Sequence, residues 1–198
     1  RYASEQIPGS EGFAMHAKGM EFGGYECRNS WGQALQFAIN ARGGCHHGYG
    51  LPPRVEHVKG LGTQLEGKGQ MVKNAATRRV LCDSAMLCTF PYPKIYGDEA
   101  LTALFSSLVG KEIPPAEVLK VGERVQTMER IFNAREGLTR DDDQLPARLT
   151  KEPKPDGPGA GAVVPLEAFK DDYYRAMGWD VATGLPGNET CRELGIKI

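Results

Sequence analysis

Glycine and proline divide this 198-residue chain into short stretches and so limit which of them can be helical. The 25 glycines and 13 prolines are concentrated between segments with helical periodicity. Glycine is common at helix ends, and proline disfavours helix in the residue before it. The pattern predicts a mainly α-helical chain whose helices are joined by long ordered loops. Strand is expected only as one or two short pieces within the Gly-rich residues 1–30.

Five stretches between these breaks carry the pattern of a helix. Ser30 is expected to cap the first and Asp98 the third, whereas proline opens the fourth and the fifth. The fourth has a long apolar stripe made of Val118, Val121, Val125, Met128 and either Ile131 or Phe132. The predicted helices cover about 31–41, about 68–87, 98–108, the residues from 115 onward and those from 165 onward.

Two long loops and a division into two domains complete the predicted organisation. A Pro-containing loop is expected from Gly48 to about Gly62, and a charged loop over residues 138–162. The charged loop contains "RDDDQLPAR", which lacks the register of an EF-hand and is interpreted as solvated or salt-bridged. We expect one domain over residues 1–95 and a C-terminal helical domain over 96–198. Cys191 is expected in an exposed tail.

Composition excludes several classes of partner. A net charge of −1 creates no field for steering onto nucleic acid or an anionic membrane. The longest nearly apolar stretch, "LTALFSSLVG", is far shorter than the roughly 20 residues of a membrane helix. Five cysteines without a Cys-x-x-Cys pair suit a reducing compartment. We expect a soluble, cytoplasmic chain, and its start at Arg1 rather than methionine suggests a piece of a longer polypeptide.

The stretch "DSAMLC" (residues 83–88) combines an acid and a thiol at the end of an apolar helical run. Asp83 is costly in such a run unless hydrogen bonds satisfy it. Asp83 and Cys88 converge only if the helix ends between them, since five residues place them well apart around a helix. Cys82 and Cys88 are either small core hydrophobes, or one of them is a thiolate ligand. The residues alone leave both interpretations open.

The stretch "GGCHHG" (residues 43–48) places two adjacent histidines after a glycine pair that ends a helix. One interpretation is that the imidazoles lie near the negative end of the helix without a further role. The other is a catalytic imidazole on a loop that approaches a cofactor closely. Adjacent side chains point in different directions, so Cys45, His46 and His47 are not expected to ligate one metal ion together.

Five segments, in order over nearly the whole chain, resemble the tungsten-containing aldehyde ferredoxin oxidoreductase family. They are "KGMEFGGYECR", "INARGGCHHGY", "DSAMLC", "RIFNAREGLTRDDDQLPARL" and "DDYYRAMGWDVATGLP". The resemblance implies the helical second and third domains of that family. Residues 1–95 would then be a partial, cofactor-facing helical domain that carries an Asp-x-x-x-Leu-Cys motif. Met86 stands where the family's motif has glycine.

The resemblance also implies cofactors and roles for particular residues. Asp83 and Leu87 would bind the pterin of a tungsten or molybdenum bis-pterin cofactor, and Cys88 would be a thiolate ligand of a [4Fe-4S] cluster. His46 would be the catalytic imidazole, with His47 as the alternative if the register shifts by one residue.

The implied function is the C-terminal portion of an iron–sulfur oxidoreductase that oxidises an aldehyde to a carboxylic acid, with ferredoxin as electron acceptor in an anaerobic cell. The family's Cys-x-x-Cys-x-x-x-Cys run is absent from residues 1–198. The isolated chain is therefore expected to be inactive. Its partners would be the missing N-terminal part of the same enzyme and ferredoxin or another electron-transfer subunit; a homo-oligomer stays open. The alternatives are a non-catalytic helical interaction module and a family member that reduces an aromatic acyl-CoA.

Overall fold

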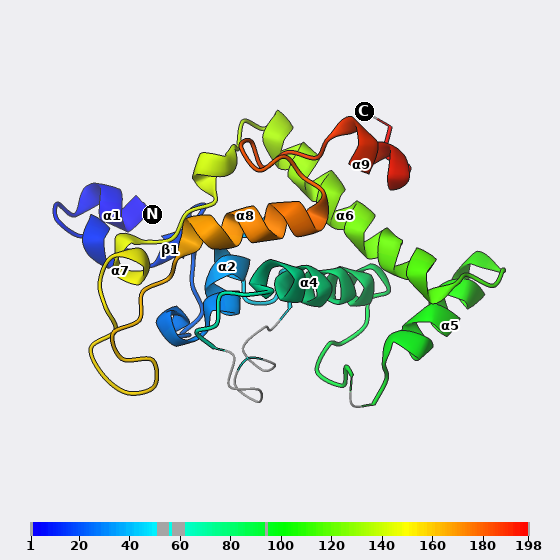
Figure 1. Cartoon of the computed structure of the whole chain (residues 1–198), viewed down its shortest axis with the longest axis horizontal. Helices are drawn as coiled ribbons and strands as arrows, with labels where there is room; N and C mark the ends of the chain where they lie inside the picture. The colour runs from blue at the N-terminus through cyan, green and yellow to red at the C-terminus, as the bar shows by residue number, and fades with distance from the viewer. Residues whose placement is uncertain (1, 51–55, 57–61, 94, 198) are drawn as a thin grey trace.

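The structure, a computed structural model, describes residues 2–50, 56, 62–93 and 95–197 (Figure 1). It is mainly helical, as the sequence predicts. Within those ranges the sheet is a single antiparallel pair, β1 (His16–Ala17) with β2 (Met20–Glu21), in the stretch where short strands are predicted. No helix in the described ranges is long and apolar enough to cross a membrane. The loop predicted from Gly48 to about Gly62 falls mostly outside the described residues.

The five predicted helices are confirmed, although α4 ends earlier than the sequence suggests. They are α2 (Trp31–Ile39), α4 (Lys68–Ser84), α5 (Asp98–Val109), α6 (Pro115–Arg135) and α8 (Leu166–Met177). Shorter elements are α1 (Tyr2–Gln6), α7 (Ala147–Thr150) and α9 (Asn188–Glu193), with 3-10 turns η1 (Glu11–Phe13), η2 (Cys27–Asn29) and η3 (Arg140–Asp142). The charged loop 138–162 thus contains two short helical pieces.

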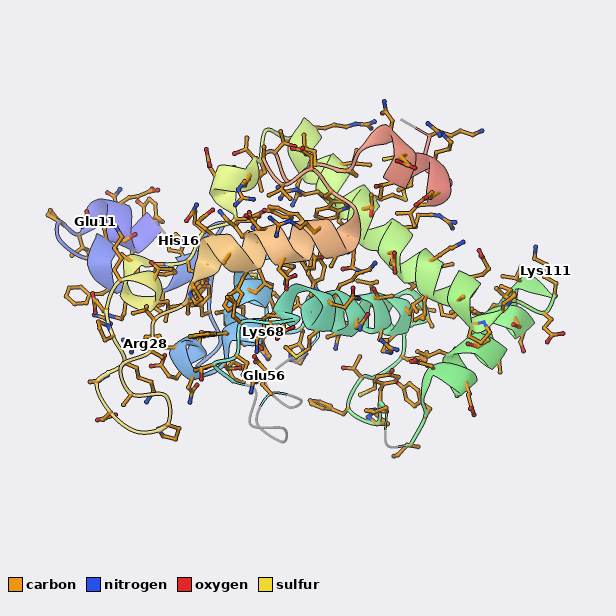
Figure 2. The ribbon with its side chains drawn as sticks, in the orientation of Figure 1. Glu11, His16, Arg28, Glu56, Lys68 and Lys111 are labelled. Carbon is orange, nitrogen blue, oxygen red and sulfur yellow. The ribbon has the colours of Figure 1, made fainter. Side chains whose placement is uncertain are left out.

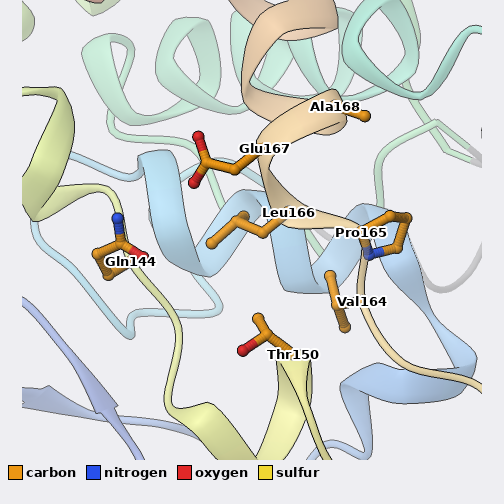
Figure 3. Close-up of a pocket in the computed structure, with 7 residues that line it drawn as sticks. All are labelled: Gln144, Thr150, Val164, Pro165, Leu166, Glu167 and Ala168. Carbon is orange, nitrogen blue, oxygen red and sulfur yellow. The ribbon is translucent and has the colours of Figure 1, made fainter.

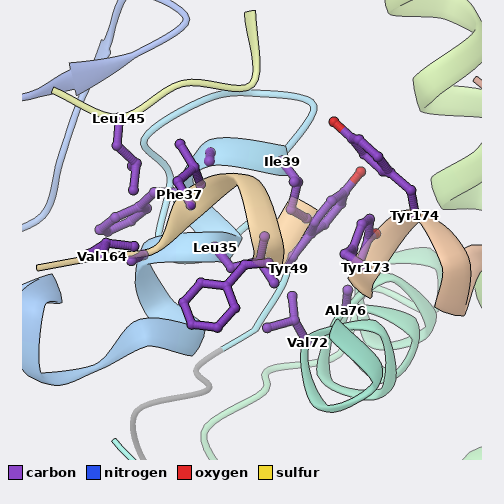
Figure 4. Close-up of a cluster of buried hydrophobic side chains, with 14 of the residues drawn as sticks. Leu35, Phe37, Ile39, Tyr49, Val72, Ala76, Leu145, Val164, Tyr173 and Tyr174 are labelled. Atoms are coloured by element: carbon purple, nitrogen blue, oxygen red, sulfur yellow. The ribbon is translucent and has the colours of Figure 1, made fainter. Parts of the chain in front are cut away.

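Helix α4 lies at the centre of the molecule. It packs against α8, α6 and α2, and α5 extends the assembly at the far end of α6 (Figure 1). One cluster of buried apolar side chains from α2, α4 and α8, with neighbouring loops, forms the core (Figure 4). Phe37, Val72 and Phe169 are fully buried within it. The core therefore draws on both sides of residue 95, and the division into domains at that residue stays a prediction.

Two glycines let the central helices approach closely. A Cβ at Gly69 would lie 2.4 Å from the backbone of Asp172 and Tyr173 on α8. A Cβ at Gly122 on α6 would lie 2.6 Å from the carbonyl oxygen of Thr77 on α4. Any larger residue at either position would force the helices apart.

The apolar stripe predicted for α6 is only partly buried, and polar side chains share the face that α6 turns inward. Val118 is buried, but Met128 and Phe132 are 53% and 63% exposed. Their place is taken by Gln126, which donates to Thr77 Oγ1 at 3.0 Å and accepts from the Tyr173 hydroxyl at 3.1 Å. A buried amide satisfied on both sides can replace apolar packing.

The predicted helix caps are confirmed only in part: Ser30 stands at the N-cap position of α2 without making the capping hydrogen bond, and the cap predicted at Asp98 is wrong. Ser30 precedes α2, but its hydroxyl donates to Glu56 at 2.6 Å instead of capping the helix. The Glu56 carboxylate accepts from Gly32 N at 2.8 Å and pairs with Lys68, beside which it lies in Figure 2. Asp98 is the first residue of α5 rather than its cap, and its carboxylate binds Arg78.

Asp143, in the charged loop, joins distant parts of the chain. Its fully buried carboxylate contacts Lys18 Nζ at 2.7 Å and Arg130 Nη1 at 2.9 Å, and it accepts from the Tyr174 hydroxyl. Burial lowers the pKa of Lys18, and the negative charge of Asp143 opposes that shift. The salt-bridged interpretation of "RDDDQLPAR" is thus confirmed for Asp143. The contact fixes the β1–β2 turn, at Lys18, against α6 and α8.

Candidate functional site

Helix α4 ends between Asp83 and Cys88, as a convergence of the two residues requires. Met86 has a left-handed backbone with φ of 55°. The N–H of Met86 donates to the carbonyl of Asp83 at 3.0 Å, and that of Leu87 donates to the carbonyl of Cys82 at 2.8 Å. These two bonds form a Schellman motif, which stops a helix and turns the chain away from its axis.

Asp83 is exposed, so the prediction of an acid buried in an apolar run is wrong. The apolar neighbours Val80, Leu81 and Cys82 face the core, whereas the last turn of α4 points Asp83 toward solvent. Its carboxylate pairs with Arg79, one turn earlier, at 2.9 and 3.1 Å. A surface pair of this kind contributes little to stability and leaves the carboxylate accessible to a ligand.

The structure distinguishes Cys88 from Cys82 and Cys191 by its exposure. Cys82 is 1% exposed, and burial raises the pKa of its thiol, so it behaves as a small core hydrophobe. Cys88 lies past the end of α4 and is exposed. Cys191, expected in an exposed tail, is buried as well, because α9 packs it inward. Cys88 is therefore the exposed thiol of the "DSAMLC" motif.

The strain at Met86 gives a prediction about stability. A side chain in the left-handed region costs about 1–2 kcal/mol, and Met86 is 93% exposed, so it gains little packing in return. Met86→Gly is expected to raise the free energy of unfolding by roughly 0.5–1 kcal/mol, after the added flexibility of the unfolded chain is subtracted. Urea unfolding measures the change.

Met86→Ala is the matched control, because alanine removes the side chain and keeps the backbone strain. It should leave the free energy of unfolding within about 0.5 kcal/mol of the original value. An equal gain in both variants would mean that the side chain, and not the backbone, is the source of the strain.

His46 and His47 occupy the two central positions of a tight turn. The N–H of Gly48 donates to the carbonyl of Cys45 at 3.2 Å and closes the turn. The two imidazole rings lie with their centroids 4.0 Å apart, and the ring of Tyr25 lies 5.4 Å from His46. Burial, together with the positive charges of His47 and Arg79, lowers the pKa of His46.

The histidine turn packs against the segment that follows α4. The ring of His47 meets the edge of Phe90 with centroids 6.5 Å apart. Arg79, which pairs with Asp83, also donates to the Thr89 hydroxyl and is close enough to act on the charge of His46. The histidine turn therefore lies against the segment that flanks the "DSAMLC" motif, with Phe90 in contact with His47 and Arg79 close enough to influence His46. Leu87, within that motif, is half-buried.

Sequence reasoning missed several residues at this site. Arg79 was detectable from its spacing of four residues before Asp83, which is typical of a helical ion pair. Glu129 on α6 lies nearby and accepts from the hydroxyl of Tyr49 at 3.0 Å, and burial raises its pKa. No local sequence pattern predicts a role for Glu129, since its hydrogen-bond partner Tyr49 is distant in sequence.

The residues present fit one part of a metal site. Among the residues that the structure describes, no three His, Cys, Asp or Glu side chains are grouped so as to hold a metal ion. The exposed thiol of Cys88 can nevertheless supply one thiolate, and the exposed carboxylate of Asp83 can accept hydrogen bonds. The donor set fits a cofactor whose other ligands come from outside this chain.

A pocket elsewhere in the described residues is separate from these side chains. It opens at the start of α8, between Gln144, Thr150 and Glu167 (Figure 3). None of the candidate site residues lines it. Its lining contains neither an Arg–Asp ion pair nor a cysteine, whereas the end of α4 has the Arg79–Asp83 pair and the thiol of Cys88.

The comparisons with known proteins place the chain in a family. The model of "Aldehyde ferredoxin oxidoreductase, domains 2 & 3" matches residues 1–196. The chain therefore belongs to the aldehyde ferredoxin oxidoreductase family and corresponds to its helical C-terminal domains.

The curated relatives carry a more specific description. Proteins named tungsten-containing aldehyde ferredoxin oxidoreductase from Pyrococcus abyssi, Pyrococcus furiosus and Thermococcus kodakarensis are 34%, 33% and 32% identical to it. Each alignment covers 98% of this chain but only 32–33% of the relative. The chain thus spans about a third of the length of these relatives.

Proposed function

We propose that this chain is the C-terminal part of a tungsten-containing oxidoreductase that oxidises an aldehyde to a carboxylic acid and delivers the electrons to ferredoxin. The observation that supports the proposal most directly is the packing of the His46–His47 turn against the segment after α4. It brings the turn that carries His46, an imidazole of lowered pKa, against the segment that joins the exposed Asp83 carboxylate, paired with Arg79, to the exposed thiol of Cys88. Groups of this kind, gathered from distant segments, are typical of a catalytic site.

Each side chain has a distinct role in the proposal. Cys88 would hold a [4Fe-4S] cluster through its thiolate, and Asp83 and Leu87 would bind the pterin, with Arg79 orienting the Asp83 carboxylate. A bound tungsten or molybdenum bis-pterin supplies the two-electron oxidation chemistry.

His46 moves a proton in this scheme. Aldehyde and water give carboxylic acid, two protons and two electrons, so the site needs a group that accepts a proton from the added water. The lowered pKa keeps the His46 imidazole neutral at neutral pH and able to accept one.

The proposal requires further parts outside residues 1–198. The remaining cluster ligands and pterin contacts come from an upstream part of the same polypeptide, consistent with the length of the relatives. Ferredoxin or another electron-transfer subunit accepts the electrons, and the free, reduced cysteines suit a reducing compartment such as the cytoplasm.

Metal analysis of two proteins tests the function. The polypeptide that the complete gene encodes is expected to contain iron and tungsten and to reduce ferredoxin when an aldehyde is added. Residues 1–198 alone are expected to hold neither metal stoichiometrically, because Cys88 supplies one thiolate and the described residues form no complete metal site. Plasma mass spectrometry and visible spectra measure both.

The outcomes separate the alternatives. A complete gene product without iron or tungsten would favour a non-catalytic helical module. If the gene product holds both metals but reduces an aromatic acyl-CoA instead of oxidising an aldehyde, the proposed substrate is wrong and the proposed cofactor site stands. An intact [4Fe-4S] spectrum in residues 1–198 alone would contradict the role of Cys88 as one ligand among several upstream ones.

A further inference from the structure

Three buried amide side chains line one face of α2 and its C-terminal end. Gln33, Gln36 and Asn40 follow one another at intervals of three and four residues, and all three are 0% exposed. The rest of the helix is largely apolar. An amide in such a core is destabilising unless its hydrogen bonds are made, so their partners indicate their role.

The hydrogen bonds of these amides converge on one carbonyl oxygen, that of Cys45. Gln36 Nε2 donates to it at 2.7 Å and Asn40 Nδ2 at 2.8 Å. Gln33 Nε2 donates to the side-chain oxygen of Gln36 and thereby orients its amide. With Gly48 N as a further donor at 3.2 Å, both lone pairs of the Cys45 carbonyl are occupied.

This carbonyl is the first corner of the turn that presents His46 and His47. Asn40 also accepts from the N–H of Arg42 at 3.0 Å, so it holds the chain before the turn as well as its start. A Cβ at Gly48 would lie 2.0 Å from Asn40 Nδ2, so Asn40 also packs against the end of the turn. Both ends of the turn are therefore fixed by side chains that belong to the protein core.

The outer side of the turn is fixed as well. A Cβ at Gly43, which has φ of 82°, would lie 2.2 Å from the carbonyl oxygen of Ala17. The chain just before the turn therefore packs against the β1–β2 hairpin. A Cβ at Gly23 would lie 3.1 Å from His46 Nδ1, so the backbone at Gly23 lies close to the imidazole.

We propose that Gln36 and Asn40 are positioning residues that fix the His46 imidazole through the Cys45 carbonyl. They do not reach the reacting atoms. Their contribution to catalysis rests on the proposed function, in which His46 transfers a proton over a defined distance. The geometric part of the proposal concerns this chain alone and needs no cofactor to be tested.

Gln36→Met removes the amide and keeps the shape and length of the side chain. Gln126→Met is the matched control, because Gln126 is an equally buried amide that bonds Thr77 and Tyr173, away from the turn. Imidazole NMR signals of residues 1–198 labelled with ¹⁵N-histidine are compared, and the signals that disappear in His46→Asn are assigned to His46. Gln36→Met is expected to shift or split the His46 signals, whereas Gln126→Met should leave them unchanged.

The complete enzyme gives the second readout. Gln36→Met is expected to lower kcat by roughly 10-fold or more with KM within about twofold, since a small displacement of a catalytic group has this effect. If Gln36→Met does not fold, Asn40→Ser removes the other donor and should shift the same signals. Unaltered His46 signals in the folded variant, or equal changes in Gln126→Met, would overturn the proposal. Shifted signals with unchanged kcat would uphold the positioning and contradict the catalytic role of His46.

Discussion

Cys88→Ala in the complete enzyme is expected to remove the iron–sulfur cluster, with loss of most or all bound iron and of ferredoxin reduction. Cys88 is the exposed thiol immediately after the Schellman turn, and a cluster that loses one thiolate ligand becomes labile. Iron content and the visible absorption of the purified enzyme measure the effect.

Cys82→Ala is the control, because Cys82 precedes the same turn but is buried in the core. It should cost only packing, on the order of 1 kcal/mol of unfolding free energy, and leave the iron content unchanged. If both variants keep their iron, the likeness of "DSAMLC" to a cluster motif is accidental.

His46→Asn is expected to lower turnover by roughly 10²–10⁴-fold, the usual effect of removing a general acid or base. Asparagine is close in size and cannot titrate, so the variant separates protonation from shape. Tungsten and iron content should stay near normal, because the proposal assigns those cofactors to Asp83, Leu87, Cys88 and upstream residues. Turnover and metal content are measured on the same preparation.

The pH dependence gives an independent check on His46. Because its pKa is lowered, the imidazole stays neutral to a lower pH than an ordinary histidine. Turnover of the unmodified enzyme should therefore fall only as pH drops below the usual histidine range, and this acidic limb should vanish in His46→Asn.

His47→Asn is the control, since its ring faces Phe90 instead of Tyr25. It should retain most of the activity. Full activity in His46→Asn with loss in His47→Asn would assign the role to His47. Full activity in both would assign the proton transfer to a residue outside this chain.

Periodicity and the positions of glycine and proline were sufficient to predict the main helices and the short strands. They failed where distant side chains compete for a local role. Ser30 is a good helix cap by type, but Glu56 takes both its hydroxyl and the helix N–H group. The buried face of α6 is set by the close approach at Gly122, which no helical pattern reveals.

The candidate site residues were proposed from the family motifs, and their geometry could not be predicted from the sequence. The family motifs pointed to His46, Asp83 and Cys88, whose roles stay predictions. The burial of Asp83 was predicted wrongly, because adjacent residues of a helix face different directions, and Asp83 faces solvent directly after the buried Cys82. The core-facing amides Gln36 and Asn40 could not be predicted from one sequence, since their role depends on a carbonyl at the far end of a turn.

The buried carboxylate of Asp143 has a consequence for how the chain folds during synthesis. Its partners Lys18, Arg130 and Tyr174 leave the ribosome at widely separated times. Until Tyr174 emerges, the buried site around Asp143 is incomplete. The ammonium of Lys18 cannot be buried there and stays in water. The β1–β2 hairpin, although first to be made, should therefore dock among the last elements. In pulse-labelled nascent chains it should stay sensitive to protease until α8 has been translated.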